Sequence, residues 1–455
     1  MNRTVMCLLV AMLFCVPALA QQANKPDTNA EEEGIFNHPE WPPPVSTAED
    51  TVVTRLDDMK KCSEPHMRRG LVNVVGELAK NKRIAIRQPI IQYILDELVF
   101  RLSGGDYDFE VRKVSVEAVI KVCDRKGVDE RIKYLTEKME KGEAVIEKPE
   151  DVEKAYKNQA KQVKDALLKA LKEDKKNEVR EQCSGFLPEI ATDDEAIKGL
   201  TEALLGDGWS SVREISIRSL VKIKNPACIP ALKKALENDP YSTVRAAAAN
   251  ALLTFDVKDA LPLFIKGLED GWSRVRLACM KAIVEFGTGE SVKHIMDRLF
   301  DKKYDVRMHA VKALGRLGDE TALPSLKKAA SDEYEEVREQ VYEAIAKIGA
   351  THSETAKTAA DILADKGLGD KVANPHMAAI SGLIELKDKR GMDALIEILA
   401  GNYPVYRKIS AIDLAITKEM KDPQIIKILS ELANSDKAGG QIKQKAKDAK
   451  EKLGN

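Results

Sequence analysis

Histidine, cysteine and carboxylate side chains are the first candidates for chemistry in this chain, and their spacing predicts no catalytic or metal site. The six histidines form neither H-x-x-x-H nor H-E-x-x-H, and the cysteines form no C-x-x-C, so the usual zinc spacings are missing. His294 and His309 fall on different predicted helices. No G-x-S-x-G turn or lysine-containing phosphate loop occurs. We therefore expect a non-enzymatic protein with no catalytic residue, metal or cofactor.

Aspartate and arginine recur together at constant spacing. A Val-Arg pair occurs seven times between Arg112 and Arg338, each time with an Asp six residues earlier, and from Arg180 onward the steps are 33, 32, 31, 31 and 31 residues. An Asp in a turn can accept N–H groups at a helix start, and an Arg can form two parallel bonds to a carboxylate. We predict a structural ladder of these residues: Asp207, Arg213, Asp239, Arg245, Asp270, Arg276, Asp301, Arg307, Asp332 and Arg338.

Aromatic residues recur four positions before the arginine. They are Trp209, Tyr241, Trp272, Tyr334 and Tyr403, with Lys303 interrupting the series. Two interpretations remain open at this point. The rings either cover the junctions between repeated units, or they form a strip that binds a peptide or another protein, since Trp and Tyr bury much area at low entropic cost. A stacked carbohydrate is a less favoured ligand because few polar side chains accompany the rings.

A repeated pair of helices is needed to position these residues. Small apolar residues follow the arginine at helical spacing, as Ala248 and Ala251 follow Arg245. Another helical stretch precedes each Asp, and Ala-Leu-Pro opens two of these stretches, at 260–262 and 322–324. The sequence therefore predicts an all-α fold, an alpha-alpha superhelix of about eleven helical pairs.

The repeated unit resembles the HEAT repeat, especially its short bacterial form, which also occurs in phycobilin lyases. The resemblance covers roughly residues 47–455 and is weakest at both ends. It implies a solenoid that binds other proteins along an extended surface, and a structural role for the Asp and Arg. It also leaves open a lyase-like or chaperone-like protein that acts on another protein.

The chain divides into five segments. Residues 1–20 carry Arg3, an apolar run and Ala18-Leu19-Ala20, which is typical of a secretory signal peptide cleaved after Ala20. We expect residues 21–46 to form a flexible Pro-rich segment, or else to dock onto the first helices or onto a partner through Phe36 and Trp41. HEAT-like repeats are expected at 47–126 and 179–455, with an irregular charged helical insertion at 127–178. A long helix in this insertion either projects from the solenoid or packs along its apolar face.

Charge and hydropathy restrict the partner and the compartment. Lys plus Arg is 72 and Asp plus Glu is 73, a net charge of −1, which argues against a nucleic-acid partner. Beyond the signal, no segment is long and apolar enough for stable membrane insertion. We expect a periplasmic or secreted scaffold that binds another protein or peptide.

The cysteine count argues against a complete disulfide framework. Without Cys7 and Cys15 of the signal, five cysteines remain, and an odd number cannot be fully paired within one chain. Cys183 and Cys279 fall three residues after a repeat arginine, where other units place small core residues, so we expect both to be buried. A bond between Cys62 and Cys123 stays open.

Overall fold

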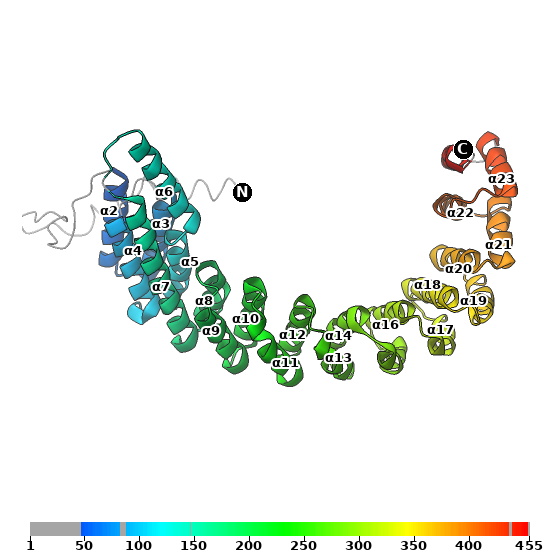
Figure 1. Ribbon diagram of the computed structural model, residues 1–455, viewed down its shortest axis with the longest axis horizontal. Helices are drawn as coiled ribbons and strands as arrows, with labels where there is room; N and C mark the ends of the chain where they lie inside the picture. The colour runs from blue at the N-terminus through cyan, green and yellow to red at the C-terminus, as the bar shows by residue number, and fades with distance from the viewer. Residues whose placement is uncertain (1–46, 82–87, 146, 436–438, 454–455) are drawn as a thin grey trace, which may run out of the picture.

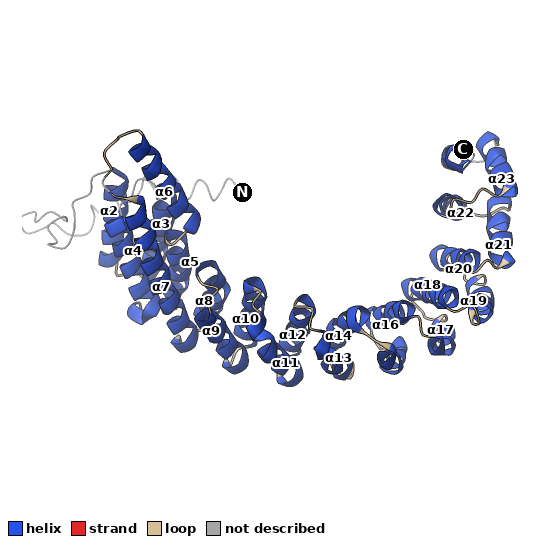
Figure 2. Cartoon of the chain, viewed as in Figure 1, coloured by secondary structure: helices blue, strands red, loops and turns tan. Residues whose placement is uncertain are grey.

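Helices stacked in pairs build a curved solenoid (Figures 1 and 2). The computed structural model describes residues 47–455 apart from 82–87, 146, 436–438 and 454–455. Within these residues every regular element is helical, and eleven helical pairs succeed one another along the arc. The predicted alpha-alpha superhelix is therefore confirmed. The signal peptide and the Pro-rich segment lie outside the described residues.

The first helix of each pair lies on the outer side of the arc and the second on the inner side, as α9 and α10 show in Figure 1. The first helices are α2 (Thr47–Lys61), α4 (Gln88–Phe100), α7 (Pro149–Glu173), α9 (Asp194–Gly206), α11 (Ile229–Asn238), α13 (Leu261–Gly267), α15 (Val292–Met296), α17 (Leu323–Ala329), α19 (Ala356–Ile362), α21 (Lys389–Ala400) and α23 (Pro423–Asn434). The second helices are α3 (Pro65–Asn81), α5 (Phe109–Val122), α8 (Asn177–Ile190), α10 (Ser210–Ile223), α12 (Ser242–Thr254), α14 (Ser273–Phe286), α16 (Tyr304–Leu317), α18 (Glu335–Thr351), α20 (Ala373–Glu385), α22 (Val405–Thr417) and α24 (Gly440–Leu453).

Short turns of 3₁₀ or π helix complete several of the first helices. They are η2 (Arg101–Gly105), η3 (Pro226–Cys228), η4 (Lys258–Ala260), η5 (Gly289–Ser291), η6 (Asp297–Phe300), η7 (Glu320–Ala322) and η8 (Leu363–Gly367). Proline stands in the first turn of α11, α13 and α17, where its missing N–H has no intrahelical partner to lose. None of the described helices has both the length and the apolar character that a membrane span needs.

The core is a continuous apolar layer between the two rows of helices. One buried cluster runs from Leu56 in α2 to Leu383 in α20, and a second runs from Met377 to Leu453. Small residues bring successive inner helices close together. At Gly315 in α16, an added Cβ would lie 2.9 Å from the Cβ of Ala344 in α18. Each pair therefore buries its apolar faces against its neighbours, as in other solenoids.

Residues 127–178 contain one extra helix and one regular helix. The extra helix is α6 (Arg125–Glu140), which packs on the N-terminal half of α7 through Val128, Leu135 and Val152. The 25-residue α7 does not project along its C-terminal half, because Val163, Ala166, Leu167, Ala170 and Leu171 are all buried. It pairs with α8 as the first helix of the third pair, so only α6 stands outside the repeat.

Candidate protein-binding surface

An Arg–Asp ladder joins successive pairs at the turns between first and second helices. Arg213 donates from Nε and Nη2 to Asp239 of the next pair, at 2.7 and 2.9 Å, and from Nη1 to the carbonyl of Asp207 in its own turn, at 2.7 Å. The same two-pronged bond recurs in every pair of this set: Arg112–Asp174, Arg180–Asp207, Arg213–Asp239, Arg245–Asp270, Arg276–Asp301, Arg307–Asp332 and Arg338–Asp370. The structure thus brings together all ten residues that the spacing assigned to a ladder.

Each ladder Asp also holds the start of its own second helix. Oδ1 of Asp270 accepts the backbone N–H of Trp272 at 2.9 Å while both oxygens accept from Arg245. Burial by itself raises the pKa of the Asp270 carboxyl, but the hydrogen bonds from Arg245 and Trp272 and the charges of Arg245 and Arg276 hold that pKa below its ordinary value. The pairs are therefore charged, buried and satisfied, which suits a structural role better than catalysis.

The ladder begins one pair earlier than the Val-Arg search indicates. Arg68 in α3 donates to both oxygens of Asp106 at 2.9 Å. The motif misses this pair because Arg68 follows Met67, and Cys62 rather than Asp stands six residues before it. At the other end, Asp370 accepts from Arg338, and His376 occupies the place of the next arginine. Asp106 alone could have indicated this first pair of the ladder, because a ladder Asp accepts from an arginine of the preceding helical pair.

Exposed aromatic rings stand beside the ladder. Trp209, Tyr241, Trp272 and Tyr334 are the residues that directly precede α10, α12, α14 and α18, and they are 57, 52, 61 and 43% exposed. Tyr304, at the start of α16, stacks on Tyr334 with ring centroids 4.9 Å apart. We call this set the aromatic edge: Trp209, Tyr241, Trp272, Tyr304 and Tyr334. The sequence search missed Tyr304 because it lies three residues before its arginine, not four.

Two rings of the aromatic edge, Tyr241 and Tyr334, contact ladder arginines and are still 52 and 43% exposed. The guanidinium of Arg213 lies 5.2 Å from the ring centroid of Tyr241, and that of Arg307 lies 5.4 Å from the ring of Tyr334. Such contacts attract the cation to the ring face and fix the ring position. The two roles weighed from the sequence, covering a junction and remaining available for a partner, are therefore compatible in the same residue.

Tyr403 does not share this arrangement. Its hydroxyl donates to Glu397 Oε1 at 2.7 Å, and its ring lies against the turn at Gly401, only partly exposed. The turn that carries Tyr403 differs from the other turns because Gly401 replaces the ladder Asp and Pro404 precedes α22. The structure therefore separates Tyr403 from the other four rings predicted with it.

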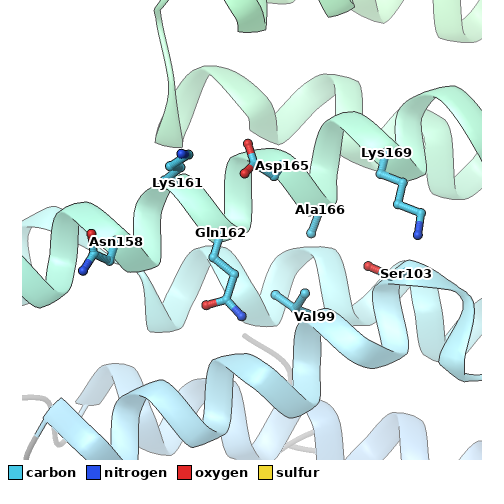
Figure 3. Close-up of a pocket in the computed structure, with 8 residues that line it drawn as sticks. All are labelled: Val99, Ser103, Asn158, Lys161, Gln162, Asp165, Ala166 and Lys169. Atoms are coloured by element: carbon cyan, nitrogen blue, oxygen red, sulfur yellow. The ribbon is translucent and has the colours of Figure 1, made fainter.

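A hollow of 450 Å³ lies between α4 with η2 and α7. Figure 3 shows Gln162 and Ala166 of α7 facing Val99 and Ser103 across it. Gln162 is held in place, because its Nε2 donates to Asp96 at 2.7 Å and its Oε1 accepts from Gln92 at 2.7 Å. The lining contains neither histidine nor cysteine, and Asp165 is its one carboxylate. This composition supports no catalytic assignment.

Four of the five described cysteines are buried. None of the five described cysteines takes part in a disulfide, so Cys62 and Cys123 are not bonded to each other. Cys183 and Cys279 are fully buried, as their place in the repeat predicts. Burial raises the pKa of the Cys279 thiol to about 12 and that of Cys228 to about 11, which keeps both in the unreactive thiol form. Across the described residues, no group of three His, Cys, Asp or Glu side chains is placed to hold a metal ion.

A family model described as HEAT repeats matches residues 164–253, 229–306 and 292–384. Residues 164–384 of this chain are HEAT repeats. The matched stretches together cover residues 164–384, from α7 to α20, and include most of the ladder and the whole aromatic edge. A search of the curated proteins finds no match.

Solved structures of karyopherins share the fold of this chain. Importin beta is 13% identical, with a TM-score of 0.58 over 89% of this chain and 57% of its own. Kap121p, solved bound to the SUMO protease Ulp1p and also bound to Pho4p, is 14% identical, with a TM-score of 0.54. The Kap121p matches cover 88% and 89% of this chain and 44% and 45% of Kap121p. The chain thus spans about half the length of these structures, and the likeness is one of fold.

Proposed function

We propose that this chain is an exported, noncatalytic scaffold that binds another protein through its aromatic edge. The observation that carries the proposal is the row of half-exposed rings held at equivalent places in successive pairs. Large rings on a backbone that is already fixed lose little freedom on binding, which makes them effective anchors. The partner we propose is a protein or peptide rather than nucleic acid, because the chain carries a net charge of −1.

Export is the part of the proposal that rests on sequence alone. The charged start, apolar run and Ala18-Leu19-Ala20 support cleavage after Ala20. Expression of the full chain in a bacterium, followed by fractionation and mass spectrometry, tests this. We expect a periplasmic or secreted protein whose first residue is Gln21. Full-length protein retained in the cytoplasm would contradict it.

Site-specific crosslinking tests the binding role. A photoreactive phenylalanine analogue at position 272, on the aromatic edge, should capture a stoichiometric protein partner in the compartment where the chain resides. The same analogue at position 234, an exposed lysine on the outer helix α11, serves as the matched control and should capture none. The double variant Trp209→Ala and Trp272→Ala should lose the partner in pull-down, whereas Tyr406→Ala, an equally exposed ring off the edge, should retain it. Equal capture by both positions would refute the assignment.

A further inference from the structure

Three consecutive pairs present their edge rings in the same way. Trp209, Tyr241 and Trp272 share one backbone conformation, with φ between −102° and −96° and ψ of 125° or 126°. Each has its N–H bound to a ladder Asp at 2.9 Å. Because packed helices lie about 8–10 Å apart, the rings recur along the edge at roughly that interval. The three rings form a regularly spaced, preorganised row.

This section of the edge carries little exposed charge. Apart from the ladder Asps, residues 207–211 and 239–243 contain no charged side chain, and the equivalent residues 270–274 contain one, the exposed Arg274. The ladder Asps there have side chains only 6–13% exposed, and each is paired with an arginine. Further charged residues follow in the next turns, at Lys302 and Lys303, and then at Glu333. A charged ligand segment would find few opposite charges along this row and would lose hydration on docking. An uncharged and moderately apolar segment would contact the rings without that loss.

A serine follows each ring at the first position of the second helix. Ser210, Ser242 and Ser273 therefore repeat with the same interval as the rings. A hydroxyl can donate to a carbonyl of a neighbouring segment. The row thus offers one ring and one hydroxyl donor per helical pair. This arrangement suits a ligand whose backbone carbonyls are not already hydrogen-bonded within the ligand.

The interval selects one backbone conformation for the ligand. A polyproline II helix has three residues per turn and rises 3.1 Å per residue, so equivalent side chains recur about every 9 Å. Same-face residues of a β-strand recur about every 6.6–6.8 Å, and an α-helix turns every 5.4 Å. Of these single repeats, that of polyproline II comes nearest to the helix spacing. Its carbonyls carry no internal hydrogen bonds, and it loses little freedom on docking against aromatic rings.

We propose that Trp209, Tyr241 and Trp272 bind an uncharged, proline-rich segment of a partner protein in the polyproline II conformation. This inference rests on the proposed function and names the chemistry of the partner. One ligand residue in three lies against a ring, and the serine hydroxyls donate to carbonyls between them. Two steps of the row require a ligand of about seven residues, since seven residues span roughly 19–22 Å.

Tryptophan fluorescence tests the inference with the mature full-length chain. The variant Trp41→Phe leaves Trp209 and Trp272 as the two reporters, because the chain has three tryptophans. A nine-residue oligoproline should shift their emission saturably and protect them from acrylamide. Nine residues of alternating Gly and Ser should not. A three-residue oligoproline can occupy only one ring and should bind at least tenfold more weakly.

Variants and a second ligand class decide the outcome. Tyr241→Ala should weaken oligoproline binding about tenfold or more, and Trp209→Ala should do the same with Trp272 as the remaining reporter. Tyr406→Ala should leave the affinity unchanged, and a melting temperature checks that each variant is folded. No response to oligoproline, or equal affinity for Tyr241→Ala, overturns the inference. A response to cellohexaose but not to oligoproline also overturns it and assigns the row to carbohydrate. If crosslinking at 272 still captures a protein while oligoproline fails, the inference fails and the proposed function stands; if neither occurs, both fail.

Discussion

Replacing Arg276 with alanine removes one pair of the Arg–Asp ladder and is expected to lower the free energy of unfolding by about 3 kcal/mol. Arg276 donates from Nε and Nη2 to Asp301, each at 2.7 Å, and from Nη1 to the carbonyl of Asp270 at 2.9 Å. Its loss leaves the Asp301 carboxylate, which is 4% exposed, with the backbone N–H of Lys303 still donating to it. The change therefore removes the partner of a buried charge.

The magnitude follows from burial and from the position at the edge. Removing one member of a buried ion pair costs about 3–5 kcal/mol, because the other charge is left unpaired. The ladder lies at the rim of the solenoid, where water can enter beside a truncated side chain, so the lower end of that range applies. In a solenoid each unit contacts only its neighbours, so the loss should be felt mainly in α14 and α16.

Urea unfolding followed by circular dichroism measures the loss, and hydrogen exchange locates it. The matched control is Arg274→Ala, an exposed arginine two residues earlier, which should stay within about 0.5 kcal/mol of the parent. A double-mutant cycle with Asp301→Asn should show a coupling of about 2 kcal/mol, because the amide oxygen can still accept from Lys303. A loss below 1 kcal/mol for Arg276→Ala, or one equal to the control, would refute the ladder reasoning. So would loss of the partner at unchanged stability.

Three further predictions concern pH, thiols and packing. The pKa values of Asp106, Asp270, Asp301 and Asp370 are lowered in the folded chain, so the stability that these carboxylates contribute is complete above about pH 4 and is lost as pH falls through the folded pKa values. The urea concentration at the unfolding midpoint should therefore decrease when the pH is lowered below about 4. An unchanged midpoint at about pH 3 would contradict this. In the native chain at about pH 8, iodoacetamide should label the part-exposed Cys62 before Cys183, Cys228 and Cys279, whose pKa values burial raises. Mass spectrometry of a time course shows the order of labelling. Equal labelling rates would contradict the burial of these three cysteines. Gly315→Ala should destabilise the fold by about 1–3 kcal/mol because the new Cβ meets Ala344, whereas Gly70→Ala, with open space around it, should stabilise the fold by up to about 1 kcal/mol. Thermal unfolding of both variants measures the difference. A destabilised Gly70→Ala would refute the comparison.

The local pattern of the sequence determined the repeat, the helical pairs and the place of the ladder residues. Asp six residues before Arg spans one turn and the start of one helix, and such a short interval has few ways to fold. The helix stripe and the Ala-Leu-Pro openings are equally local. The fold class could therefore be derived from spacing alone, and so could the position of Trp209, Tyr241 and Trp272 at the start of second helices.

Contacts between units were decided only by the tertiary structure. The pairing of Arg68 with Asp106 joins residues 38 apart without the repeated motif, and the stacking of Tyr304 on Tyr334 joins two different turns. The regular place of α7 beside α8 was likewise hidden by its length and by the extra helix α6. The physical reason is common to all three: these contacts depend on how neighbouring helices are spaced and rotated against each other. That geometry is set by side chains packing across the interface, and no single stretch of sequence contains it.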